Sequence, residues 1–262
     1  MVVQGLTGAA RAMYAAAVAG LGVLLVSNAF VYVWAPIPRS VPGRHEIACA
    51  AGALILVAAV GLLLRKTVAP CSVILAGCFL GWLLVLQVPQ IIAAPAMELL
   101  WSGGAQIATL IAGGWILFAS LASPTERPAR RLRGDRGVRM ARSLYAAALP
   151  LFGLHHFFSP SGGAEAVPAW LPFRSGWGYL TGVAHILAGV AILLGIVPRM
   201  AATLEAIMIS AFVLLVHVPG IVDAPKDHLQ WTMLFVASAI AGAAWIAARS
   251  YPSSAARVGR DG

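Results

Sequence analysis

Long apolar runs alternate along the chain with short polar segments. A helix needs about 20 mostly apolar residues to cross a bilayer. Eight runs approach that length, at residues 12–34, 47–64, 70–88, 100–122, 143–159, 177–195, 201–218 and 230–248. The runs are continuously apolar and do not alternate, which excludes a membrane β-barrel. The pattern predicts an all-α membrane protein with eight transmembrane helices.

The apolar pattern occurs twice. Residues 52–122 align with residues 182–252 at a constant shift of 130, without a gap. In that register Val88-Pro89 lies over Val218-Pro219, Trp101 over Trp231, and Trp115 over Trp245. Matching prolines and tryptophans at one fixed shift indicate a tandem duplication.

The duplication predicts two fused four-helix units. Four is an even number of spans, so both copies enter the membrane in the same orientation and form a parallel internal repeat. We expect an N-terminal unit at residues 1–122, a basic connector at 123–142 and a C-terminal unit at 143–262.

The two copies differ in their ionisable residues. The second copy has His185, His217, Asp223, Asp227 and His228 where the first has Ile55, Gln87, Ala93, Met97 and Glu98. His155 and His156 lie opposite leucines, so five of the six histidines belong to the second copy. We therefore expect the chemistry in the C-terminal unit and a scaffolding role for the N-terminal one.

Composition and charge agree with a membrane location. The chain is 60% hydrophobic and only 10% charged, with a mean hydropathy of +0.87, which excludes an ordinary soluble domain. Under the eight-span topology, 14 of the 18 lysines and arginines fall on one side and 4 on the other. This asymmetry places the connector and both termini in the cytoplasm of a multi-pass cell-membrane protein. It also favours the lipid bilayer over nucleic acid as the partner of the positive charge.

The three cysteines form no CxxC pair, so they indicate neither a disulfide scaffold nor a thiol redox motif. Glu205 lies near the cytoplasmic end of its span, six residues after Arg199, and these two are expected to form an ion pair at the membrane surface.

Three elements of the second copy resemble the DoxX-like membrane family. They are Gly153-Leu-His-His-Phe-Phe, then Val167-Pro-Ala-Trp-Leu-Pro172, then Tyr179-Leu-Thr-Gly-Val-Ala-His-Ile-Leu-Ala-Gly189. The resemblance covers about residues 143–248, and His185 stands where the family usually has glutamate. It implies a four-helix fold and an association with redox systems, with other redox proteins as partners.

The histidines predict a candidate site toward the outer face of the C-terminal unit. His185 and His217 are expected to handle protons, as catalytic groups. His155, His156, Trp170, Asp223 and His228 are expected to bind a cofactor. Three interpretations stay open. The histidines could order the outer loops, hold a metal or haem, or line a pocket for a quinone. The corresponding functions are a membrane oxidoreductase or a subunit of one, a metal-binding membrane protein, and a non-enzymatic scaffold or assembly factor.

Overall fold

The computed structural model describes residues 8–28, 37–38, 40–121, 129–158, 163–164 and 167–252, and it is all-helical over these residues. The helices are α1 (Ala9–Asn28), α2 (Arg44–Gly61), α3 (Val68–Trp82), η2 (Leu83–Gln87), α4 (Val88–Ala93), α5 (Glu98–Leu121), η3 (Ala129–Leu132), α6 (Gly134–Phe158), α8 (Arg174–Leu194), α9 (Pro198–Phe212), η4 (Val213–His217), α10 (Val218–Asp223) and α11 (His228–Arg249). The two termini and residues 122–128 of the connector lie outside the described residues.

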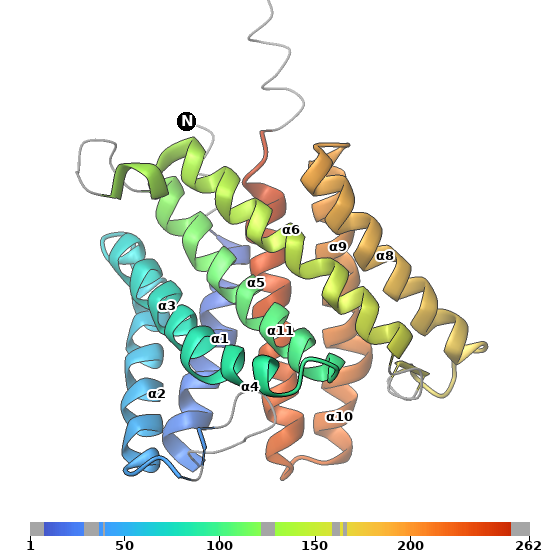
Figure 1. The fold of residues 1–262 in the computed structure, drawn as a ribbon, viewed down its shortest axis with the longest axis horizontal. Coiled ribbons are helices and arrows are strands. Elements are labelled where there is room, and N and C mark those ends of the chain that lie inside the picture. The colour runs from blue at the N-terminus through green and yellow to red at the C-terminus, as the bar shows by residue number, and fades with distance from the viewer. Residues whose placement is uncertain are drawn as a thin grey trace, which may run out of the picture.

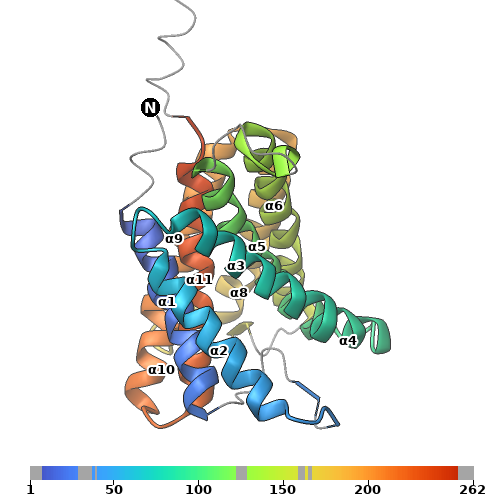
Figure 2. The ribbon, with the colours of Figure 1, turned by 90° about the vertical axis from the view of Figure 1, so that its left-hand side faces the viewer.

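Helices α5 and α11 form the centre of the bundle (Figures 1 and 2). About 70% of each is buried (72% and 67%), against 28–39% for the other apolar helices that are long enough to cross a membrane. Helix α1 packs against α2 and α11, whereas α6 packs against α8 and α5. The first helix of each half therefore contacts the central helix of the other half.

Seven helices or continuous helical segments among the described residues are long and apolar enough to cross a membrane. The expected fifth span, within α6, is not one of them. Its first turns carry Asp135, Arg136, Arg139 and Arg142, and its uncharged part begins only at Ser143. Over the described residues the structure is therefore all-helical, with seven helices or helical segments of membrane-spanning length and hydropathy.

Three helices in each half begin at positions that are related by a shift of 130. Helices α2, α3 and α5 begin at residues 44, 68 and 98, and α8, α9 and α11 begin at 174, 198 and 228. The two short π-helices, η2 and η4, have the same length and lie at the same relative position. Trp101 and Trp231 each donate a 2.9 Å hydrogen bond from Nε1, to the carbonyls of Pro95 and Pro225.

The π-helices change one expectation from the sequence. The spans predicted at residues 70–88 and 201–218 stop directly before Pro89 and Pro219, but each proline lies inside a continuous helical segment of 26 residues, Val68–Ala93 and Pro198–Asp223. A proline lacks an N–H and clashes with the carbonyl four residues earlier. The wider π-turn directly before each proline relieves that conflict, so the helix continues. His217 consequently lies about 9 Å below the end of its helical segment rather than at that end.

Candidate functional site

A cavity of about 610 Å³ lies inside the C-terminal half of the bundle. Its walls come from α6, α8, α9, η4 and α11, with Ser102 and Gln106 of α5 closing one side. Most of the lining is apolar, and the volume is typical of a site for a small organic molecule. Trp170, Pro168 and Leu171, from the segment before α8, line the cavity as well. Because Trp170 is 71% exposed, the cavity reaches the surface of the protein there.

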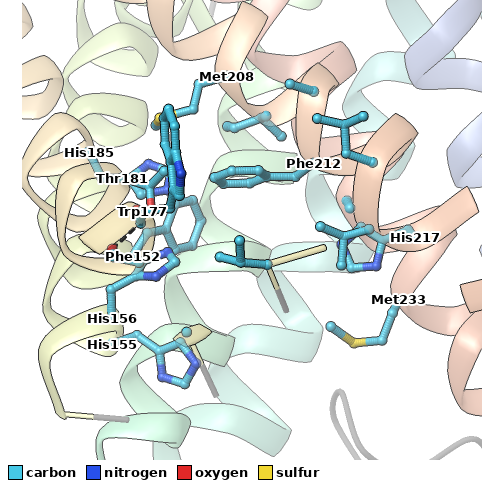
Figure 3. Close-up of a pocket in the computed structure, with 18 of the residues that line it drawn as sticks. Phe152, His155, His156, Trp177, Thr181, His185, Met208, Phe212, His217 and Met233 are labelled. Carbon is cyan, nitrogen blue, oxygen red and sulfur yellow. Dashed lines mark hydrogen bonds between the residues drawn. The ribbon is translucent and has the colours of Figure 1, made fainter. Parts of the chain in front are cut away.

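Four histidines line this cavity (Figure 3). His155, His156 and His185 gather on one side of the view, and His217 lies on the other side beside Met233. The His156 and His185 rings are stacked, with centroids 5.6 Å apart and planes inclined by 22°. Phe152 and Phe212 pack edge-on against His185. The structure thus brings together His155, His156, Trp170, His185 and His217, five of the seven residues expected from the sequence.

The close approach of α6 and α8 places the stacked pair. Gly153 and Gly182 face each other where the two helices cross, and a Cβ on Gly153 would lie only 2.4 Å from the Gly182 carbonyl oxygen. His156 and His185 each lie three residues after one of these glycines. Small residues let helix backbones approach in lipid, and here they allow two imidazoles to meet.

His185 is bonded to Glu205, which corrects an expectation from the sequence. Nδ1 of His185 lies 2.6 Å from Oε1 of Glu205, and both residues are almost fully buried. Glu205 was expected to pair with Arg199 at the membrane surface, but its side chain points into the bundle and is 1% exposed. The Arg199 guanidinium donates instead to the Pro252 carbonyl.

The contact between His185 and Glu205 could not be predicted from either residue alone. A glutamate near a helix end, close in sequence to an arginine, usually belongs to the interface. The available signal was the internal alignment, because the counterparts of His185 and Glu205 in the first half are Ile55 and Leu75. Both are buried, at 1% and 0% exposure. Two buried apolar positions in one copy are thus occupied by a histidine and a glutamate in the other.

Asp223 and His228 do not line the cavity. Asp223 is exposed at the end of α10, and His228 is the exposed first residue of α11. Asp227 between them caps α11, accepting a 2.8 Å hydrogen bond from the Leu229 amide. The helix continues six residues past His217, which carries Asp223 and His228 away from the histidines they were expected to join.

His155 connects the cavity to the N-terminal half. Its Nδ1 lies 3.3 Å from Oε1 of Glu98, the first residue of α5. His217 and its counterpart Gln87 behave differently. Gln87 is buried and donates to the Leu100 carbonyl at 2.6 Å, whereas His217 faces the cavity.

The donor groups do not converge on a single point. Among the described residues, no group of three histidine, cysteine, aspartate or glutamate side chains is arranged to hold a metal ion. The planes of the His156 and His185 rings are inclined by only 22° with centroids 5.6 Å apart, so their ring nitrogens lie in nearly parallel planes and do not point at one shared metal ion. The arrangement suits a flat organic ring that contacts imidazoles and aromatic rings.

Comparison with known proteins adds one match. Residues 145–247 match the model of a family described as a domain of unknown function (DUF8561). No curated protein and no solved structure matches the chain. The matched segment runs from Tyr145 in α6 to Ala247 in α11 and contains all five gathered site residues, together with Glu205.

Proposed function

We propose that the chain is a redox-associated integral membrane protein that binds a quinone-like molecule in the cavity of its C-terminal half. The cavity carries this proposal, because its apolar volume of about 610 Å³ is bordered by a buried His185–Glu205 pair. A quinone ring is flat and apolar, and its carbonyl oxygens accept hydrogen bonds and protons. His185 and His217, on two sides of the cavity, are the groups that would meet those oxygens.

The architecture behind this proposal is an eight-helix protein of two fused four-helix units, residues 1–122 and 143–262, joined by the basic connector 123–142. The coincident starts of three helix pairs and the paired tryptophan hydrogen bonds support the duplication. Helix α6 supplies the eighth span, with its arginines at the membrane surface. The motifs shared with the DoxX-like family support a role beside other redox proteins.

The quinone proposal is tested by filling the cavity. Ala237 of α11 lines it, and the counterpart of Ala237 in the first half is the buried Ile107. We expect a short-chain benzoquinone or naphthoquinone to quench the tryptophan fluorescence of the purified protein, since Trp170 and Trp177 line the cavity. Ala237→Ile occupies part of the space and should weaken binding by about tenfold or more, a loss of about 1.4 kcal/mol or more.

Ala53→Ile is the matched control, since it makes the same substitution at an exposed position of α2. Equal quinone binding by Ala237→Ile and the wild type would contradict the site. A haem Soret band in the absorption spectrum of the purified protein would show that the bound cofactor is a haem and not a quinone. A protein without either ligand that copurifies with other membrane proteins would support the scaffold or assembly function.

The proposed topology has both termini and the connector in the cytoplasm, because most basic residues fall on that side. Asp135 and Asp223 are exposed and lie on opposite sides of the membrane in this topology. In a variant with the three native cysteines replaced by alanine, we expect Asp223→Cys to react with a membrane-impermeant thiol reagent in intact cells. Asp135→Cys should react only after the membrane is permeabilised. The reverse pattern would invert the topology.

A further inference from the structure

Among the described residues, four buried polar atoms in or beside the wall of the cavity have no hydrogen-bond partner: Nδ1 of His155, Nδ1 of His156, Oε2 of Glu205 and the hydroxyl of Tyr145. The last two belong to side chains that are each 1% exposed and do not line the cavity. A buried polar group without a partner costs about 1–3 kcal/mol, so such atoms in a folded protein call for an explanation. Tyr145 lies within electrostatic range of Glu205.

The first half of the chain gives the reference for Tyr145. Its counterpart, Tyr14, is equally buried and donates a 2.7 Å hydrogen bond to the carbonyl of Leu110. The counterpart of Glu205 there is the apolar Leu75. In the second half the hydroxyl of Tyr145 makes no hydrogen bond to the backbone of the described residues, and the carboxylate of Glu205 takes the place of the leucine side chain. Both changes separate the functional half from the scaffolding half.

These groups belong to a longer series that crosses the bundle. His156 stacks on His185, and His185 is bonded to Glu205. Beyond Tyr145, Tyr251 lies within electrostatic range, and its ring is covered by the Arg142 guanidinium at 3.8 Å. Arg142, Tyr145, Phe152 and His156 share one face of α6. From Arg142 to His156 this face runs for about 21 Å, most of the thickness of a hydrocarbon core of about 30 Å.

We propose that His185, Glu205 and Tyr145 form a proton relay between the cavity and the end of the bundle that carries Arg142 and Tyr251. The relay rests on the proposed function, because a quinone takes up protons when it is reduced. Each passage moves one proton toward the cavity, after which Glu205, now protonated on Oε2, and His185, now protonated on Nδ1, reorient to their starting states. The Tyr145 hydroxyl gives its proton to Oε2 of Glu205 and regains one from the Tyr251 end. Glu205 passes the proton on Oε1 to Nδ1 of His185, and the proton on Nε2 of His185 leaves into the cavity. Because neither the Tyr145 hydroxyl nor Oε2 of Glu205 has a hydrogen-bond partner in the part of the chain that the structure describes, an ordered water carries the proton between them.

The test measures proton movement without any quinone. The full chain is reconstituted into liposomes that contain a pH-sensitive dye, and a potassium diffusion potential is imposed with valinomycin. Because the cavity also reaches the surface at Trp170, we expect a proton flux above that of protein-free liposomes. Tyr145→Phe and Glu205→Gln should each lose most of this flux, whereas Tyr14→Phe should keep it.

The same two tyrosine variants also serve as the control for correct folding. Tyr145→Phe removes a hydroxyl without a partner, so it should not lower thermal stability, whereas Tyr14→Phe removes a satisfied hydrogen bond and should be the less stable variant. A wild type with no flux above protein-free liposomes would overturn the relay. So would a well-folded Tyr145→Phe variant with full flux.

Quinone binding separates this proposal from the previous one. Tyr145 does not line the cavity, so Tyr145→Phe should bind the short-chain quinone as tightly as the wild type does. Flux that depends on Tyr145 in a protein that binds no quinone would uphold the relay and reject the quinone. Quinone binding without flux would do the opposite.

Discussion

Replacing Glu205 by leucine destabilises the protein, and replacing His185 by isoleucine destabilises it more, by about 3–5 kcal/mol if the carboxylate stays ionised. The second change is the more severe because it leaves a buried carboxylate without its imidazole, 2.6 Å away in the wild type. The first leaves a neutral imidazole, whose lost hydrogen bond costs about 1–3 kcal/mol. Unfolding in detergent, followed by tryptophan fluorescence, measures both losses.

The double variant His185→Ile/Glu205→Leu should recover most of this stability. It installs the residues that occupy the same positions in the first half, Ile55 and Leu75, which are fully buried there. Replacing a buried ion pair by well-packed apolar residues is often neutral or stabilising. The double variant should therefore fold and yet bind no quinone. If it is as unstable as His185→Ile alone, the two side chains are not energetically coupled.

The helical architecture was accessible from the sequence because the hydrophobic pattern is strong and occurs twice. The structure begins α2 and α8 at Arg44 and Arg174, and α5 and α11 at Glu98 and His228, each pair at the shift of 130 read from the sequence. The ends of α4 and α10 were not predicted. A proline normally marks the end of a helix. No local sequence signal predicts the π-turns that allow the helices to continue through Pro89 and Pro219.

The candidate site was predictable only in part, for a reason that lies in helix packing. The distribution of histidines indicates which half of the chain contains the site, but it does not show which faces of the helices pack against each other. Glu205 was assigned to the surface from its neighbours in sequence, whereas its contact with His185 depends on how α9 packs against α8. Asp223 and His228 are close to His217 in sequence and are nevertheless separated from the cavity, because the helix carries them beyond it.

Substituting Gly153 by alanine should disturb both the fold and the cavity. The new Cβ would lie 2.4 Å from the Gly182 carbonyl oxygen and 2.5 Å from Cγ1 of Ile186, so α6 and α8 must separate. Overpacking of this kind costs about 1–3 kcal/mol. Because His156 and His185 stack three residues beyond the two glycines, their separation should also weaken binding of the short-chain quinone.

Gly81→Ala provides the control for this last prediction, because Gly81 is also helical and a Cβ there would meet nothing within 4 Å. Alanine at such a site is neutral or stabilises by about 0.5–1 kcal/mol, since glycine loses more backbone entropy on folding. We expect Gly81→Ala to match or exceed the wild type in thermal stability and to bind the quinone unchanged. A Gly153→Ala protein with wild-type stability and quinone binding would show that α6 and α8 can accommodate a methyl group where Gly153 and Gly182 meet. In that case the stacked histidines would owe their position to the surrounding phenylalanines, Phe152 and Phe212, rather than to the glycines.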